Sequence, residues 1–402
     1  MRIVNRLVLW PVLLERFTCA GAMTAFTAIA GPIGRVLGLA PWQVGATVTI
    51  AGATWTLLAR PWGRASDRIG RRPVMLTGVA GFVVSYAAIA VFVDSALDNN
   101  YSVATAFFGL VITRGLAGAF YAGVQPTTVA LIADYKEPAE RAGTIALLGA
   151  ATGAGLVFGP ALAGLAAPLG LGLALFMLAP LPLLALIALA LTLPREAKHP
   201  STPKTRHLAL SDPRLRRPVV SGFVAMFSVT IAQVTIGFYA IDRLAIDPEA
   251  GARVAGFALA SVGVALIVSQ ISVRRLGWPP EQLLKCGTGV AAVGFGLTTI
   301  ATSAPIIWCC YFIAAFGMGW VWPSVSALAS IAVDKDQQGA AAGSVSAAQG
   351  LGTIVGPLVG TLIYSIDISA PYVVVSALLG LLTLWPRSAR HVTDTGDASS
   401  DA

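Results

Sequence analysis

The sequence predicts an all-α membrane protein, in which twelve transmembrane helices form two pseudo-symmetric six-helix bundles. Of its 402 residues, 56% are hydrophobic and only 11% are charged, and the mean hydropathy is +0.77. A soluble domain carries about 25% charged residues, so this composition requires a surface covered by lipid. The chain contains many stretches of the length that crosses a bilayer, about 20 residues. Its two halves also repeat one sequence pattern.

Twelve apolar stretches are the expected membrane spans. The first begins basic, like a signal peptide, but continues past Gly31 without a convincing cleavage site, so we expect it to remain as a helix. Most of the others are apolar on all sides. In order, the expected spans cover residues 7–31, 43–62, 74–93, 103–132, 143–167, 171–193, 218–240, 254–273, 284–303, 306–332, 340–364 and 370–386.

One long polar segment separates the spans into two sets of six. Residues 194–217 hold four prolines and seven lysines or arginines and contain no apolar run. We therefore expect a first bundle over residues 1–193, a cytoplasmic linker over 194–217, a second bundle over 218–386 and a cytoplasmic tail over 387–402.

The distribution of basic residues predicts the orientation. Of 27 lysines and arginines, 22 fall in segments on one side of the expected spans and three on the other. Cytoplasmic loops are enriched in these residues, so both termini are expected in the cytoplasm. The net charge of +8 lies in short connectors and forms no basic face for nucleic acid. Arginine exceeds lysine 22 to 5, which suggests a GC-rich bacterium and its inner membrane.

The repeat is clearest around two glycine–proline segments. Pro126 and Pro160 are 34 residues apart, as are Pro323 and Pro357, and each segment ends in G-x-x-x-G-P. Small residues let membrane helices approach closely, and proline bends them. Duplicated halves with a site between them are typical of secondary transporters. The residues of this motif are Gly155, Gly159, Pro160 and Gly164 in the first half and Gly352, Gly356, Pro357 and Gly360 in the second.

Three motifs resemble those of the major facilitator superfamily, over nearly the whole chain. The stretch GRASDRIGRRP matches the loop signature G-x-x-x-D-R-x-G-R-R, and LVITRGLAG is similar to the second motif of the family. In that second motif, Ala117 replaces a common glutamine. GLVFGPALAG resembles the motif of the 12-span drug:proton antiporters, although Ala146 and Ala163 replace glycines. The resemblance implies that the two halves rock about a central cavity.

The resemblance also implies that the stretch GRASDRIGRRP, between the second and third expected spans, is a latch that holds the cytoplasmic ends of the two halves together. In this interpretation Asp67 pairs with Arg68 or Arg71, or faces the start of span 11 at residues 337–342. The alternative is that the arginines only anchor the topology. The latch residues are Gly63, Asp67, Arg68, Gly70, Arg71 and Arg72.

Charges inside a membrane are costly and usually functional. Glu15 is the only carboxylate well within a span, and Arg114 lies in the middle of span 4. We expect both to take part in proton coupling, with Arg114 as the partner of Glu15. A structural pair of Glu15 with Arg16 is the alternative.

Polar and aromatic residues within the spans are candidates for a cavity that binds an amphipathic solute. The four cysteines lie in apolar stretches without a CxxC spacing, and the three histidines lie in the expected cytoplasmic segments, so no metal, cofactor or enzyme activity is expected. A phosphate-binding loop is absent from the sequence, which excludes an ATP-driven pump in a single chain. The candidate cavity residues are Tyr121, Gln125, Gln233, Tyr239, Trp320, Trp322 and Gln349.

Proton-coupled export of a drug or a secondary metabolite, such as a siderophore, is the function that the sequence favours. An importer of a sugar or an organic acid is the alternative, and a membrane-embedded enzyme would need a catalytic cluster that is missing from the sequence. The expected partners are a small-molecule substrate, protons and the lipid bilayer, and the chain is expected to function as a monomer.

Overall fold

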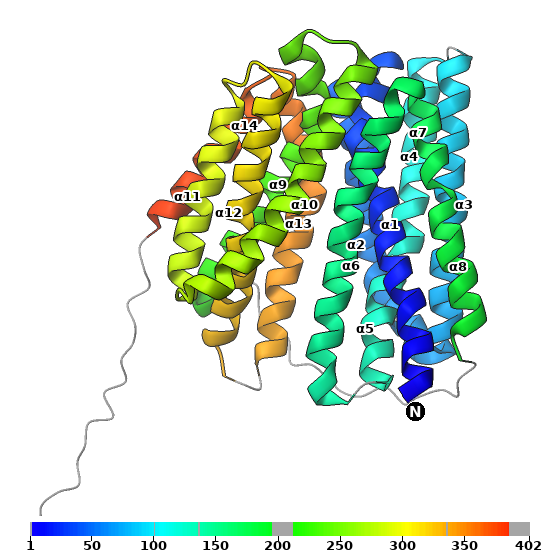
Figure 1. Cartoon of the computed structure of the whole chain (residues 1–402), viewed down its shortest axis with the longest axis vertical. Helices are drawn as coiled ribbons and strands as arrows, with labels where there is room; N and C mark the ends of the chain where they lie inside the picture. Colours follow the sequence, from blue (N-terminus) through cyan, green and yellow to red (C-terminus); the bar gives the residue numbers. More distant parts are fainter. Residues whose placement is uncertain (1, 100, 136, 195–211, 335–336, 386–402) are drawn as a thin grey trace, which may run out of the picture.

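The computed structural model describes residues 2–99, 101–135, 137–194, 212–334 and 337–385, and all regular structure within these ranges is helical (Figure 1). The first half contains α1 (Arg2–Val36), α2 (Pro41–Ile69), α3 (Arg71–Asp98), α4 (Val103–Tyr121), α5 (Val124–Tyr135), α6 (Pro138–Ala166), α7 (Leu171–Leu178) and α8 (Pro180–Thr192). The second half contains α9 (Arg216–Leu244), α10 (Pro248–Leu276), α11 (Pro280–Thr298), α12 (Ala304–Ile331), α13 (Gln338–Tyr364) and α14 (Ala370–Leu384).

Among the described residues these segments form twelve rods, because α4 continues into α5 and α7 continues into α8 as single membrane-span candidates. The predicted all-α membrane fold with two six-helix bundles is therefore confirmed. Expected span 4 is interrupted at 122–123, between α4 and α5. The end of the expected linker is helical, since α9 begins at Arg216, while residues 195–211 and the expected tail lie outside the described residues.

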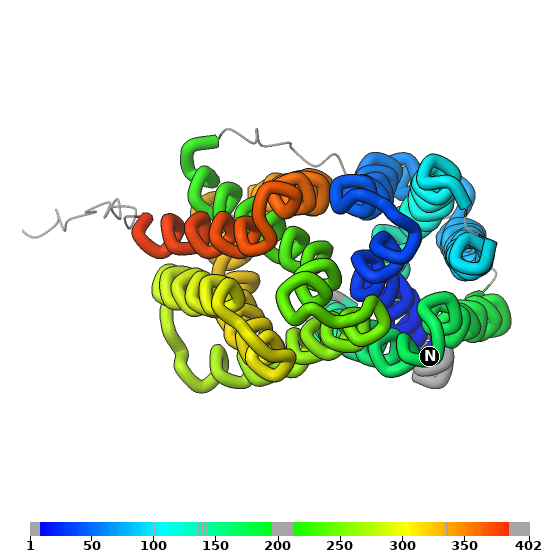
Figure 2. The backbone as a smooth tube through the Cα atoms, turned by 90° about the horizontal axis from the view of Figure 1, so that it is seen from above, coloured from blue at the N-terminus to red at the C-terminus, as the bar shows by residue number. Residues whose placement is uncertain are grey.

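Nine helices in the described ranges are long and apolar enough to cross a membrane by themselves. The three other rods are α2, α11 and α14. The α2 helix has the length, but its sequence includes three arginines and Asp67, which lower its hydropathy. The α14 helix has only 15 residues. These helices stand beside the nine in the same two bundles (Figure 2).

The helix connections lie at two opposite ends of the molecule, called the lower and the upper end. The lower end holds the start of α1, the α2–α3 connection at Gly70 and the start of α13 (Figure 1). The upper end holds the α1–α2 connection at residues 37–40 and the α9–α10 connection at 245–247. Gly70 alone joins α2 to α3 with a φ of 103°, a conformation that favours glycine, so this residue allows the chain to reverse within one position.

The glycine–proline segments pack equivalently in the two halves. A Cβ at Gly155 or Gly159 of α6 would collide with the backbone of α1, at the carbonyl oxygens of Phe17 and Gly21. In the second half, added Cβ atoms at Gly352, Gly356 and Gly360 of α13 would lie within 3 Å of α9, at the Phe227 backbone and the Thr230 and Ile231 side chains. The repeat in the sequence therefore corresponds to one helix pair that occurs twice.

The two halves meet at the upper end and separate toward the lower end. Helix α2 contacts α13 from Gly45, which lies against Thr361, to Thr56, which lies near Gly350. Gly164 of α6 lies 3.1 Å from Gly256 of α10, measured from an added Cβ to Cα. Farther down, added Cβ atoms at Gly63 of α2 and Gly343 of α13 would meet nothing within 4 Å. Neither position therefore contacts the other half, in keeping with the wider spacing of the two halves at the lower end in Figure 1.

Candidate functional site

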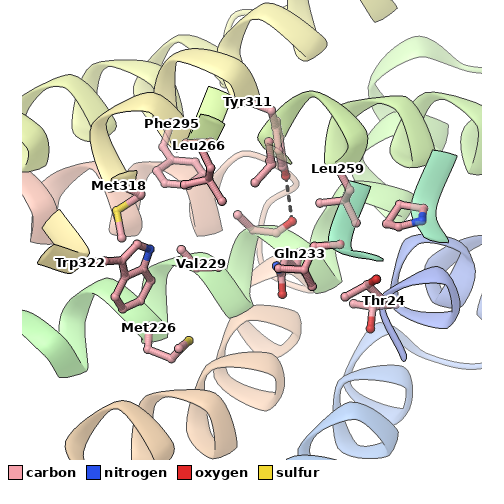
Figure 3. A pocket seen from close by; sticks show the side chains of 16 residues that line it. Thr24, Met226, Val229, Gln233, Leu259, Leu266, Phe295, Tyr311, Met318 and Trp322 are labelled. Atoms are coloured by element: carbon pink, nitrogen blue, oxygen red, sulfur yellow. Dashed lines mark hydrogen bonds between the residues drawn. The ribbon is translucent and has the colours of Figure 1, made fainter. Parts of the chain in front are cut away.

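A cavity of about 280 Å³ lies between the halves, at the middle of the helices (Figure 3). Helices α1 and α6 contribute Thr24, Thr27, Leu156 and Pro160 from the first half. The remaining lining comes from α9 to α12 of the second half: Met226, Val229, Ala232, Gln233, Leu259, Val262, Leu266, Phe295, Tyr311, Ala315, Met318 and Trp322. The cavity is thus built from both halves, as a transporter that works by rocking requires.

The lining is mainly apolar and carries no charged side chain. Two methionines and two aromatic rings, Met226, Met318, Phe295 and Trp322, gather at one end of the cavity, and Gln233 lies between this group and Thr24 (Figure 3). Methionine and aromatic side chains adapt to flat apolar ligands, and a few polar groups then fix the orientation of the ligand.

Two of the predicted cavity residues, Gln233 and Trp322, line this cavity. Tyr239 and Trp320 do not. The Tyr239 hydroxyl donates to the Thr298 carbonyl oxygen, and the Trp320 indole donates to Ser272 Oγ at 2.7 Å, so both side chains hold helices of the second bundle together. An aromatic residue in an apolar helix does not reveal from sequence whether it faces a cavity or a neighbouring helix.

The three remaining candidates lie elsewhere. Tyr121 packs against Phe82, with 5.1 Å between the ring centroids, and Gln125 is exposed at the start of α5. Gln349 lines a separate cavity of about 110 Å³ between α12 and α13. Sequence analysis missed most of the lining, including Thr24, Thr27, Met226, Phe295, Tyr311 and Met318, because nothing in their spacing distinguishes them from ordinary apolar helix positions.

Glu15 and Arg114 do not pair in this structure. Glu15 is fully buried, and its nearest cation is Arg16, with 3.6 Å between Arg16 Nε and Glu15 Oε2. Neither oxygen of Glu15 accepts a hydrogen bond from the described residues. The expected Glu15–Arg114 pair is therefore absent, and the alternative pair with Arg16 is present.

Arg114 instead packs among apolar groups of α1. Its guanidinium carbon lies 4.4 Å from the centre of the Phe26 ring, and Nη1 lies 3.4 Å from Met23 Sδ. The side chain is buried, and no carboxylate of the described ranges lies within ion-pair distance of it. A buried cation without an opposite charge costs free energy, which marks Arg114 as a functional candidate.

The loop at Gly70 is bound within the first half. Arg71 pairs with Asp67 and, at 3.0 Å, with Asp134 of α5, while Arg72 donates to the Ala190 carbonyl oxygen of α8 at 2.8 Å. The Asp67–Arg71 contact is thus one of the pairs considered from the sequence. Asp67 makes no hydrogen bond or ion pair to the described start of α13, in keeping with the separation of the halves at this end.

A second ionic contact, which the sequence did not predict, joins the halves at the upper end. Arg35 at the end of α1 pairs with Asp242 of α9, and the Tyr364 hydroxyl of α13 donates to the same carboxylate at 2.6 Å. The Arg35 guanidinium also lies 5.5 Å from the centre of the Phe238 ring. These contacts hold the upper ends of the two bundles together.

Residues 16–357 and 280–399 match the family described as Major Facilitator Superfamily, which covers most of the chain. The chain belongs to this family. It is therefore a membrane transporter rather than an enzyme. The glycine–proline helix pair occurs in both halves of the chain, and the cavity lies between these halves.

Similar proteins include drug resistance proteins. The tetracycline resistance protein, class C, of Escherichia coli is 29% identical over 331 residues, which cover 78% of each chain. Multidrug resistance protein 1 of Bacillus subtilis (strain 168) is 24% identical over 366 residues, covering 89% of this chain and 90% of the relative. Among solved structures, an inward-facing, unoccupied bacterial homologue of the human lysosomal transporter Spinster has a TM-score of 0.71 at 15% identity, covering 96% and 95% of the two chains, and supports the fold alone.

Proposed function

We propose that this protein exports a lipophilic, drug-like small molecule from the bacterial cytoplasm in exchange for protons, by alternating access across the inner membrane. The observation that carries the proposal is the apolar cavity shared by both halves, together with relatives named for tetracycline and multidrug resistance. These names favour a drug over a siderophore as the substrate. We also propose that one chain contains the complete transport path.

The orientation of the open end indicates where an exporter would take up its substrate. The arginines of the α2–α3 region stand at the lower end, which the enrichment of basic residues in cytoplasmic loops assigns to the cytoplasm. The halves separate at this same end. An exporter would collect its substrate in this conformation, and an importer would release its substrate in it, so the choice of export depends on the relatives and on the cavity.

The cavity chemistry disfavours the importer alternative. A sugar requires many hydrogen-bonding groups, because each of its hydroxyls loses water on binding. An organic acid requires a cation, and none of the described residues that line the cavity is a lysine, an arginine or a histidine. The lining instead matches an apolar molecule with few polar atoms.

We further propose that Glu15 carries the coupled proton. A carboxyl group is neutral when it binds a proton and negative when it releases the proton. One site can therefore differ in charge between the two conformations. Glu15 is buried on α1, which contributes Thr24 and Thr27 to the cavity and Arg35 to the upper contact. Protonation of Glu15 would break its pair with Arg16 and change the packing of a helix that touches both features.

Transport in vesicles tests this proposal. Inside-out vesicles with an imposed pH gradient should accumulate tetracycline and release protons from the lumen when they contain the wild-type protein. Glu15→Gln should lose uphill accumulation but retain exchange down a substrate gradient. Glu249→Gln, in the first turn of α10, is the matched control and should behave as wild type.

Two results would contradict the proposal. If the wild-type protein moves no substrate against a gradient, proton-coupled export is wrong. If Glu15→Gln still accumulates substrate with the proton coupling of wild type, Glu15 is a structural partner of Arg16 and the proton is carried elsewhere.

A further inference from the structure

The central cavity provides no counter-charge for an ionic ligand. None of its sixteen lining residues is acidic or basic. The nearest buried carboxylate along α1 is Glu15, nine residues before Thr24, which is about 13 Å at the rise of an α-helix. Glu15 is also already paired with Arg16. A cation entering this cavity would lose its hydration, and attraction to the aromatic rings offsets only part of that loss.

Most polar groups of the lining are already hydrogen-bonded to the backbone. The Thr24 hydroxyl donates to the Ala20 carbonyl oxygen at 2.8 Å, and the Thr27 hydroxyl donates to Met23 O at 3.3 Å. The Tyr311 hydroxyl lies 2.8 Å from the Ala232 carbonyl oxygen, to which it donates. These hydroxyls therefore have no proton to offer a ligand in the arrangement that the structure shows.

Two polar groups of the lining make no hydrogen bond to the described residues: the Trp322 indole N–H, which can only donate, and Gln233. Its side-chain amide makes no hydrogen bond to any residue that the structure describes, although it is partly exposed to the cavity, and Figure 3 places it at the centre of the lining. An amide supplies both donors and an acceptor. A ligand that displaces water from Gln233 must replace the hydrogen bonds of that amide, or binding is weakened by an unsatisfied polar group.

On the basis of the export function proposed above, we infer that the cavity selects an uncharged molecule with a flat apolar body and a carbonyl-type hydrogen-bond acceptor, and that Gln233 determines this specificity. The body of the ligand packs among Met226, Phe295, Met318 and Trp322, and its acceptor meets the Gln233 amide. The absence of lining charge excludes cations of the same shape from tight binding.

Three probes of one shape separate charge from hydrogen bonding. Acridone is neutral and has a carbonyl group, N-methylacridinium is a cation with the same three fused rings, and anthracene is the hydrocarbon without a polar atom. Binding is measured at equilibrium by fluorescence titration of the purified full-length protein in detergent, without a pH gradient. Wild type should bind acridone at least about ten-fold more tightly than N-methylacridinium.

Substitutions at Gln233 provide the decisive comparison. Gln233→Leu should weaken acridone binding by about three- to ten-fold, the effect of one hydrogen bond, and leave anthracene binding unchanged. Gln233→Glu introduces a carboxylate of nearly the same shape and should reverse the preference in favour of N-methylacridinium. Gln349→Leu, in the smaller cavity between α12 and α13, is the control and should change none of the three affinities.

Several outcomes would overturn the inference. Equal affinity of wild type for acridone and N-methylacridinium would show that the cavity does not discriminate against charge. An unchanged acridone affinity in Gln233→Leu, or an equal loss for acridone and anthracene, would remove the specific role of Gln233. Failure of all three probes to bind would show that the cavity does not accept flat apolar molecules.

These outcomes are distinct from a failure of the export proposal. The titrations use no gradient, so selective binding of acridone without proton-driven accumulation in vesicles would sustain the inference and contradict proton-coupled export. Proton-driven transport of tetracycline without the charge preference would sustain export and contradict the inference.

Discussion

Asp242→Asn should shift the protein away from the conformation described here. Asp242 accepts from Arg35 of the other half and from the Tyr364 hydroxyl of its own half, at the end where the two halves meet. Asparagine has nearly the same shape and still accepts a hydrogen bond, but it removes the charge. The substitution therefore weakens the upper contact without creating a void.

The expected effect is modest but measurable. The Asp242 and Arg35 side chains are 24% and 39% exposed, and an ion pair of this exposure contributes about 0.5 kcal/mol. The hydrogen bond from Tyr364 also loses a charged acceptor, but Tyr364 and Asp242 belong to the same half, so this loss affects both conformations and does not change their ratio. The loss of about 0.5 kcal/mol from the contact between the halves corresponds to about a two-fold change in the ratio of the two conformations.

Spin labels at the lower end report that ratio. Gly63 and Gly343 face open space, so cysteines at both positions accept labels in a background in which the four native cysteines are replaced. Asp242→Asn should increase the population with a short distance between the labels. Asp247→Asn is the matched control, since its residue caps α10 at the upper end without contacting the first half, and asparagine also caps helices.

A double substitution separates the contact from a local effect. Arg35→Gln should produce a similar shift, and Arg35→Gln combined with Asp242→Asn should shift the ratio by less than the sum of the two. If the distance distribution of Asp242→Asn matches that of Asp247→Asn, or if the two shifts are additive, the upper contact does not stabilise the open lower end and the reasoning is wrong.

Gly159→Ala should destabilise the purified protein by about 1–3 kcal/mol, because the added methyl group meets the Gly21 carbonyl. Gly149→Ala is the control and should not destabilise it, because Gly149 faces open space. Equal melting temperatures of the two variants would contradict the close packing of α6 on α1. Arg114→Met should retain or raise the melting temperature, since the buried cation has no carboxylate partner among the described residues. Transport by this variant should fall at least about ten-fold, and normal transport would refute a functional role of Arg114. Asp67→Asn should remain in the membrane but export more slowly, because Arg71 loses one of its two carboxylates, and a normal export rate would leave the loop as a topology anchor.

The number and order of the helices were determined by the sequence. Long apolar runs can satisfy their backbone hydrogen bonds in a membrane only as helices, so composition and length together predict the twelve rods. The α2–α3 turn was also predictable, since Gly70 stands between two helices, and so was the Asp67–Arg71 pair, whose partners are four residues apart. Both are local features that a short stretch of sequence specifies.

The direction in which each helix faces was decided only by the tertiary structure. Gly149 and Gly153 have the same spacing as Gly155 and Gly159, yet the first pair faces open space and the second packs on α1. Glu15 was expected to reach Arg114, but Arg16 is its neighbour. The physical reason is common to these cases: lipid and protein interior are both apolar, so a helix that is apolar all round carries no stripe to show which face meets lipid, a partner helix or the cavity.

The contacts between the two halves also depend on which way each helix faces. Arg35, Asp242 and Tyr364 come from three helices far apart in the sequence, and each alone is an ordinary residue near a helix end. The cavity likewise collects Thr24, Gln233 and Met318 from α1, α9 and α12. The sequence specifies the two bundles because each bundle forms from local patterns. The site between them exists only when the bundles lie side by side. No single helix contains enough of the site for it to be recognised from sequence.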